Sequence, residues 1–235
     1  MAEYYPPVPP VELGPIARYL ASAVNGPGGA NPVDGTLIDT WVPFEALVGS
    51  PNLTQALMTD RPMWTDGDGY GRPAVMLGVS GWMVSAFVPP SGASPRSIVM
   101  IGGEWLSTPQ TALVRYGTNM PPVAGAFFSV ETGLTGKFGW NLGASDRGEG
   151  ITQASNSPHA VVVTYDGSTI LIQADGAGPS SNGVTANTTP SQLVIGGTMT
   201  FGLYELRIYD RALSLPEITD ILTYASVTYG TPNPK

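Results

Sequence analysis

Cysteine is absent from this sequence, and lysine and histidine are nearly absent. Without cysteine the chain can form neither a disulfide framework nor a thiolate metal site. The two lysines are Lys137 and Lys235, and the one histidine is His159. With a single imidazole and no thiolate, we expect no transition-metal site.

Positive charge is scarce and scattered. Lys and Arg total 10 against 18 Asp and Glu, so the formal net charge is −8, and no run of basic residues occurs. Nucleic-acid binding requires clustered cations that displace the counterions of phosphates. We therefore expect neither a nucleic-acid partner nor an anionic membrane surface as a partner.

Signals for export and for membrane insertion are also missing. The N-terminal residues MAEYYPPVPPVELG lack the basic start and apolar core of a signal peptide. No uninterrupted apolar run approaches the roughly 20 residues that cross a bilayer. We therefore expect a protein that is made in the cytoplasm and has no membrane partner.

Glycine and proline are plentiful instead, at 30 and 23 of 235 residues, and only 12% of the residues are charged. This composition favours many short strands joined by tight turns in one domain. Asp166-Gly167, between VVVTY and STILI, predicts a hairpin. The other strand-like runs lie at 37–44, 74–79, 82–88, 97–102, 111–116, 126–130 and 137–141.

The C-terminal region predicts a strand followed by a helix. Tyr204, Leu206 and Ile208 alternate with polar residues, which predicts that they share one face of a strand. Ser214-Leu-Pro-Glu217 is a capping box, and the apolar stripe of a helix follows it, at Ile218, Ile221, Leu222 and Ala225.

The N-terminus predicts an extended arm. Prolines restrict the backbone and remove hydrogen-bond donors over residues 1–11, and 12–24 has the apolar spacing of a short helix. We assign 1–36 to this arm and 37–235 to the main domain. The arm is either a mobile tail or a docking segment, and docking would use Tyr4, Tyr5, Pro6, Pro7, Pro9 and Pro10.

Three segments carry a family resemblance. They are NLTQALMTDRPMWTDGDGYGRPAVML at 52–77, HAVVVTYDGSTILIQADG at 159–176, and GLYELRIYDRALSLPEI at 202–218. In this order they resemble the concanavalin A-like, LamG-type jelly-roll superfamily. The resemblance implies an all-β, two-sheet antiparallel jelly-roll sandwich with a short C-terminal helix. It implies little about function, because the superfamily includes lectins, glucanases, adhesion modules and virus structural domains.

Two kinds of binding site are suggested by the loops. Asp66 and Asp68 lie in one Gly-rich loop, which suits calcium, although a solvated turn has the same composition. Carbohydrate binding needs an aromatic platform beside polar groups. The aromatic candidates are Trp64, Tyr70, Trp105 and Trp140. For each tryptophan the alternative is core packing, which a sandwich of this size favours.

Catalytic patterns are missing from the sequence. Glucanases of this fold need two carboxylates flanking the sugar bond, but Glu131 has no acidic partner nearby on its strand. Glu205 is followed by Arg207, which predicts a strand ion pair. His159 has no serine in a G-x-S-x-G elbow. We therefore expect no enzyme activity and no cofactor other than calcium.

These observations favour a bacteriophage virion protein, because a lectin-like fold without an export signal suits a virion surface. The expected partner is a major capsid protein or another virion protein, with the arm docked on the shell as a capsid decoration or head fibre. We also expect a homo-oligomer, with a trimer as a guess. The alternatives are a glycan-binding lectin or tail-fibre adhesin, and then a glycoside hydrolase acting through Glu131 or Glu205.

Overall fold

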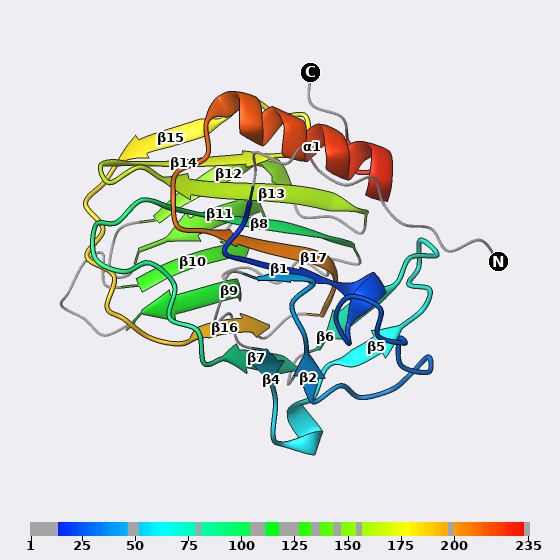
Figure 1. Ribbon diagram of the computed structural model, residues 1–235. Coiled ribbons are helices and arrows are strands. Elements are labelled where there is room, and N and C mark those ends of the chain that lie inside the picture. The colour runs from blue at the N-terminus through cyan, green and yellow to red at the C-terminus, as the bar shows by residue number, and fades with distance from the viewer. Residues whose placement is uncertain are drawn as a thin grey trace.

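The computed structural model describes residues 14–46, 52–78, 81–103, 111–117, 127–132, 137–142, 147–153, 157–196 and 200–232. Within them, two antiparallel β-sheets pack face to face and one α-helix covers the outside of one sheet (Figure 1). The predicted jelly-roll sandwich with a short C-terminal helix is confirmed. The described helices include none with the length and apolar character needed to cross a membrane.

Sheet 1 lies beneath the helix and contains nine strands. They run in the order β15-β14-β13-β8-β17-β1-β3, with β6 paired to β17 and β5 paired to β6. Their bounds are Ser180–Gly183 (β15), Thr169–Ala174 (β14), His159–Tyr165 (β13), Arg96–Gly103 (β8), Phe201–Tyr209 (β17), Ala17–Leu20 (β1), Glu45–Ala46 (β3), Ala74–Leu77 (β6) and Met63–Thr65 (β5).

Sheet 2 contains eight strands, in the order β12-β11-β10-β9-β16-β7-β4-β2. Their bounds are Arg147–Gln153 (β12), Lys137–Asn141 (β11), Phe127–Thr132 (β10), Thr111–Gly117 (β9), Leu193–Gly196 (β16), Trp82–Ser85 (β7), Leu53–Thr54 (β4) and Thr40–Trp41 (β2). Two 3₁₀ turns, Ala21–Ala23 (η2) and Met58–Asp60 (η3), complete the short elements.

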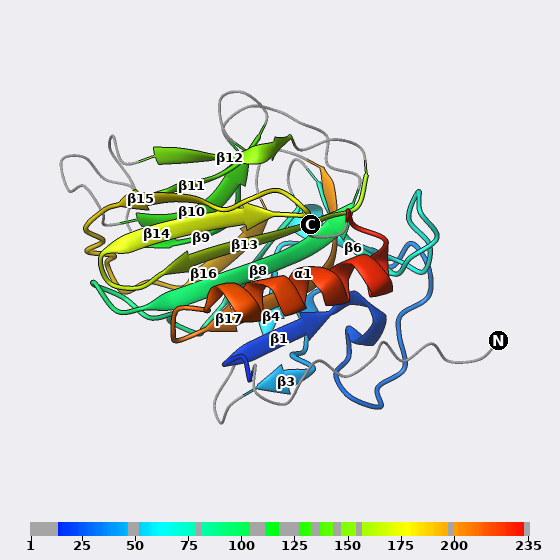
Figure 2. The same ribbon diagram turned by 90° about the horizontal axis from the view of Figure 1, so that it is seen from above.

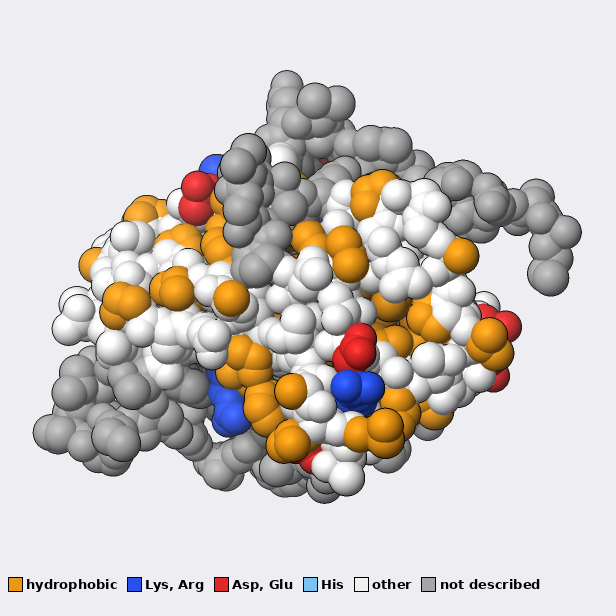
Figure 3. Space-filling model, turned by 60° about the horizontal axis from the view of Figure 1, so that its bottom comes forward, with side chains coloured by type: hydrophobic (Ala, Val, Ile, Leu, Met, Phe, Trp, Pro, Cys, Tyr) orange, Lys and Arg blue, Asp and Glu red, His pale blue; other side chains and the backbone are white. Residues whose placement is uncertain are grey.

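The core lies between the sheets and is filled by large rings, among them Trp41, Trp140, Phe128 and Phe138. A second apolar cluster joins sheet 1 to the helix, and Figure 2 shows the helix lying along this sheet. The surface seen when the bottom of Figure 1 is turned forward has few charged side chains (Figure 3). Leu57 and Met58, beside and within η3, are 60% and 67% exposed.

The hairpin at Asp166-Gly167 is confirmed, with β13 and β14 paired from Val161–Ala174 to Tyr165–Ile170. One carboxylate oxygen of Asp166 accepts the backbone N–H groups of Ser168 and Thr169, at 2.8 and 2.7 Å. These hydrogen bonds lower the pKa of Asp166. The turn is therefore specified by its own residues.

The predicted helix over 12–24 is replaced in the described residues by a strand. Ala17–Leu20 pairs antiparallel with β17, from Ala17–Ile208 to Leu20–Glu205, and all four of its residues are buried. A strand that is covered on both faces carries apolar residues on both, so its sequence can imitate helical spacing. This strand lies inside the stretch 1–36 that the sequence assigns to the arm. The six predicted docking residues, from Tyr4 to Pro10, lie outside the described residues.

The prediction that Tyr204, Leu206 and Ile208 share one face of β17 is wrong, because the strand contains a bulge. The pairing of β17 with β8 shifts register between Leu203 and Glu205, so Tyr204 does not share a face with Leu206. Leu203 and Leu206 belong to the core between the sheets, whereas Tyr204 belongs to the cluster under the helix. Tyr204 stacks there on Tyr229 with ring centroids 5.4 Å apart.

The C-terminal helix α1, Leu215–Tyr229, begins as its sequence predicts. Ser214 and Glu217 form the capping box, and the Glu217 carboxylate accepts the Ser214 N–H at 2.8 Å. Arg211 bonds the same carboxylate at 2.7 Å, which holds the pKa of Glu217 at about 2. Gly230 ends the helix in the left-handed conformation, with φ of 66°.

A buried ionic network lies between sheet 1 and α1. Glu205, which is fully buried, accepts Arg18 Nε at 2.6 Å and Arg207 Nε at 2.5 Å on one oxygen. Its other oxygen accepts the hydroxyl groups of Tyr224 and Tyr229 at 3.0 and 2.9 Å. Burial alone would raise the pKa of Glu205, but the charges of Arg207 and Arg18 outweigh it and hold this pKa below its ordinary value.

We expect the protein to lose much of its stability when the charge of Glu205, at the centre of the network, is removed. Glu205→Gln leaves two buried guanidinium groups without a counter-charge, so we expect the free energy of unfolding to fall by about 3–5 kcal/mol. Urea denaturation measures this loss. Arg211→Ala, which breaks the more exposed pair with Glu217, is the control and is expected to cost less than about 1 kcal/mol. Equal losses in the two variants would contradict the role of burial.

Candidate functional site

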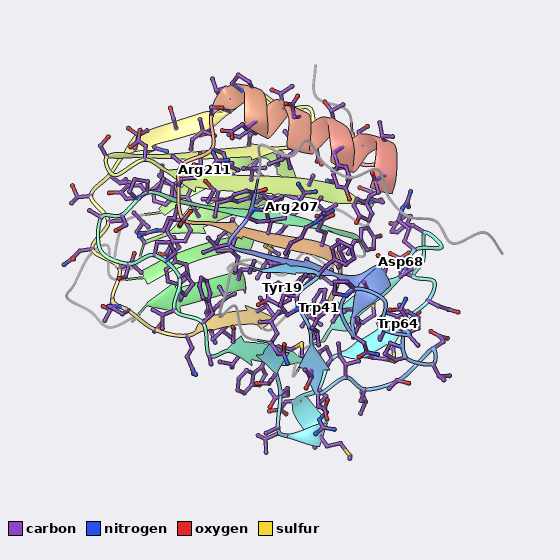
Figure 4. All side chains as sticks on the ribbon, viewed as in Figure 1. Tyr19, Trp41, Trp64, Asp68, Arg207 and Arg211 are labelled. Atoms are coloured by element: carbon purple, nitrogen blue, oxygen red, sulfur yellow. The ribbon has the colours of Figure 1, made fainter. Side chains whose placement is uncertain are left out.

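A cluster of aromatic, acidic and basic side chains lies at the end of sheet 1 where β8 ends and β17 begins. It consists of Asp68, Tyr70 and Arg72, from the loop between β5 and β6, and of Tyr204 from β17. We call these four residues the end cluster. Figure 4 shows Asp68 at this edge of the molecule, well away from Arg211.

The loop of the end cluster is folded around the Asp68 carboxylate. One oxygen accepts the backbone N–H groups of Tyr70 and Arg72, at 2.8 and 3.0 Å. The backbone N–H of Asp68 donates to the Arg72 carbonyl at 2.9 Å, and Gly71 turns the chain with φ of 71°. The Tyr204 hydroxyl donates to the second carboxylate oxygen. The loop is thus tied to itself and to β17.

Two glycines allow the close approach of these groups. A Cβ on Gly103, the last residue of β8, would lie 3.2 Å from Tyr70 Cδ2 and would collide with the Tyr204 hydroxyl. A Cβ on Gly230 would lie 2.9 Å from Arg72 Nη2. The Arg72 guanidinium therefore lies against the C-terminal end of α1, where the helix dipole favours a cation.

The end cluster reaches solvent on one side. Tyr204 is buried, and burial together with its bond to the Asp68 carboxylate raises the pKa of its hydroxyl. Tyr70, Arg72 and Asp68 are half-buried, and the neighbouring Asp66 is exposed. A solvent-edge aromatic ring beside a guanidinium and carboxylates can stack on an apolar ligand face and exchange hydrogen bonds with hydroxyl groups.

The predicted aromatic candidates are separated by the structure. Trp64 is 3% exposed and donates from Nε1 to the Ala21 carbonyl at 2.8 Å, and Trp140 is 2% exposed. Both rings pack in the core between the sheets, because each points inward from its strand. Trp105 lies outside the described residues. Tyr70 is the described candidate whose side chain reaches the surface.

The two predicted calcium ligands, Asp66 and Asp68, have different surroundings in the structure. The Asp68 carboxylate is engaged on both oxygens, and the Asp66 backbone N–H donates to Asp34 Oδ1 at 3.2 Å. Among the described residues, no group of three or more His, Cys, Asp and Glu side chains is placed to hold a metal ion. Calcium binding by Asp66 and Asp68 stays a prediction.

Sequence reasoning missed two members of the end cluster and the partners of His159. The bulge hides Tyr204, and Arg72 has no local signal beyond its place in the loop. The structure also places Ser157 and Asp175 against the His159 ring, at 3.0 and 2.7 Å. Glu205 is held in the buried network, and the Glu131 side chain lies outside the described part of the chain.

The sequence matches no known family model and no curated protein. The fold is similar to that of Trypanosoma rangeli sialidase, with 15% identity and a TM-score of 0.58 over 97% of this chain and 36% of that one. It is also similar to an arabinofuranosidase complexed with arabinofuranosyl-alpha-1,2-xylobiose, with 11% identity and a TM-score of 0.60 over 82% and 51% of the two chains. A third is the Botulinum neurotoxin serotype D binding domain, with 9% identity and a TM-score of 0.53 over 89% and 50%.

These comparisons show the fold alone, because every identity is low and fold does not determine function. The chain spans 36–51% of the length of these proteins. The prediction that the chain is not an enzyme is contradicted, since two of the three structures are of enzymes, a sialidase and an arabinofuranosidase. None of the three descriptions names a virus, so the capsid partner, the trimer and the virion surface stay predictions.

Removing one oxygen atom tests the hydrogen bond that ties the loop to β17. Tyr204→Phe removes the hydroxyl that donates to Asp68, and we expect a loss of about 1–3 kcal/mol in the free energy of unfolding. Tyr209→Phe is the matched control on the same strand, because the buried Tyr209 hydroxyl interacts with Arg207 and not with the loop. Urea denaturation of the two variants should separate them. Equal stabilities would contradict the proposed tie.

Proposed function

We propose that this chain binds carbohydrate at the end cluster, with Tyr70 as the stacking platform. The main support for this proposal is the position of the half-buried Tyr70, which lies beside Arg72 and Asp68 on a loop tied to β17. Sugar rings have apolar C–H faces and polar edges. A ring platform with donors and acceptors at its side suits both.

The restraint of the loop supports this proposal. The hydrogen bonds of Asp68 fix the loop before any ligand arrives, so little conformational entropy is lost on binding. The Arg72 guanidinium can donate to hydroxyl oxygens, and the exposed Asp66 carboxylate can accept from hydroxyl groups. These are the polar contacts that orient a sugar on an aromatic ring.

The charge and the fold narrow the ligand class. A net charge of −8 repels polyanions at long range, so we propose an uncharged oligosaccharide as the ligand. The similar sialidase, and the arabinofuranosidase complexed with an oligosaccharide, support carbohydrate as the chemical class by analogy of fold. A tail-fibre adhesin, one of the alternatives that the sequence suggests, is compatible with this proposal. The docking of residues 1–11 on a capsid remains a separate prediction.

Tyr70→Ala is expected to abolish most of the binding. The protein is screened on a glycan array, and the best uncharged ligand is then titrated by calorimetry. We expect Tyr70→Ala to weaken binding at least about tenfold, a loss of roughly 1.4 kcal/mol or more, and Tyr70→Phe to keep the ring and most of the affinity.

Trp82→Ala is the matched control, because Trp82 is a half-buried aromatic residue on β7 of sheet 2. This variant is expected to bind as the unaltered protein does. Loss of binding in Trp82→Ala with full binding in Tyr70→Ala would place the site on the other sheet and contradict the proposal.

Calcium dependence is tested separately. If Asp66 and Asp68 bind calcium, millimolar calcium raises the melting temperature, and Asp66→Asn and Asp68→Asn remove that rise. Differential scanning fluorimetry with and without a chelator measures it, with Asp166→Asn as the control in an exposed turn. An identical melting temperature with calcium and with the chelator would refute the site.

A further inference from the structure

His159, Ser157 and Asp175 form a chain of hydrogen bonds at the same end of sheet 1, beyond the end cluster. His159 Nδ1 lies 2.7 Å from Asp175 Oδ2, and His159 Nε2 lies 3.0 Å from Ser157 Oγ. This is the order of a carboxylate, an imidazole and a hydroxyl in which the imidazole can act as a general base.

The carboxylate determines the tautomer of the ring. Asp175 Oδ2 accepts a hydrogen bond from Nδ1, while Asp175 Oδ1 accepts the Ala160 backbone N–H at 2.9 Å. A proton on Nδ1 leaves Nε2 with a free lone pair in the neutral imidazole. Nε2 therefore accepts from Ser157 Oγ, which is the direction in which a proton leaves a nucleophilic serine.

The backbone holds each member in place. Pro158 follows Ser157 and restricts its backbone to extended conformations. His159 begins β13 and pairs with Gly102 of β8, and its ring meets the Phe138 ring edge-on at 5.3 Å. Asp175 has φ of 51°, the one positive φ among the described residues other than glycine. The three groups are thus fixed by pairing, packing and a constrained turn.

Burial decreases along the chain of hydrogen bonds toward the hydroxyl. Asp175 and His159 are 2% and 3% exposed, whereas Ser157 is half-buried and keeps part of its surface in solvent. The carboxylate is shielded from water, and Ser157 is the most exposed of the three residues. Ser168 offers a contrast, because its hydroxyl donates to the exposed Asp166 in a turn that has no imidazole.

We infer that Ser157 is the nucleophile of an acyl-transfer site that cleaves carboxylic esters, with His159 as general base and Asp175 as its orienting carboxylate. Ser157 Oγ attacks the ester carbonyl carbon and its proton passes to His159 Nε2. The ester C–O bond breaks, and the leaving alkoxide takes that proton as an alcohol. Water then attacks the acyl-serine, gives a proton to Nε2, and releases the carboxylic acid as Ser157 regains its hydrogen.

The test labels the full-length chain with a fluorophosphonate and locates the adduct by peptide mass spectrometry. We expect a single adduct on Ser157, no adduct in Ser157→Ala, and labelling slowed by at least about a hundredfold in His159→Gln and Asp175→Asn. Hydrolysis of p-nitrophenyl acetate should fall in the same order. Ser168→Ala should label at the unaltered rate. Labelling needs no carbohydrate ligand, so its outcome tests this site separately from carbohydrate binding.

Ser157→Ala removes a half-buried hydroxyl, and its melting temperature shows whether the fold is kept. If the folded, unaltered chain takes no label, or if Ser157→Ala is labelled as fast as the unaltered chain, Ser157 is not an activated nucleophile and the hydrogen bonds serve structure alone. Labelling of Ser157 that persists at full rate in both His159→Gln and Asp175→Asn would also overturn the assignment.

Discussion

The Glu205 carboxylate is the point on which the arrangement of sheet 1 and its helix depends. It accepts hydrogen bonds from Arg18 of β1, from Arg207 of its own strand and from two tyrosines of α1. Two buried guanidinium groups need this anion as their counter-charge. If β1 or α1 separated from the sheet, the hydrogen bonds to Glu205 would break and buried charges would lose their partners. The same contact sets the end of α1, where Tyr229 stacks on Tyr204 and Gly230 meets Arg72. The positions of the end-cluster residues therefore depend on the buried network.

Sequence predicts the parts of this fold whose causes are local. The turn at Asp166-Gly167 and the cap from Ser214 to Glu217 depend on residues a few positions apart, and both appear as predicted. The bulge in β17 depends on pairing with β8, which no local pattern reports. It places Tyr204 beside Glu205 on the helix side of the sheet. The predicted ion pair between Glu205 and Arg207 is present there as part of a buried network.

The candidate sites show the same division. The loop around Asp68 could be found from its Gly and Asp content, yet its tie to Tyr204 spans 136 positions of sequence. Trp64 resembled a loop platform in the sequence, but the alternation of β5 turns its ring into the core. The partners of His159 were missed because Asp175 approaches across a hairpin, and no motif reports that pairing. Gly102 and Gly103 bring the two sites to neighbouring positions on β8.

Amide chemical-shift mapping locates the carbohydrate site on the folded chain. The isotope-labelled chain is titrated with the uncharged glycan that binds most tightly on an array. We expect the shifting amides to cluster at residues 66–72, 102–103 and 204, around Tyr70 and Arg72. Shifts confined to 82–84 and 194–196, on the paired strands β7 and β16 of sheet 2, would place the ligand on the other sheet and rule out a site at the end cluster.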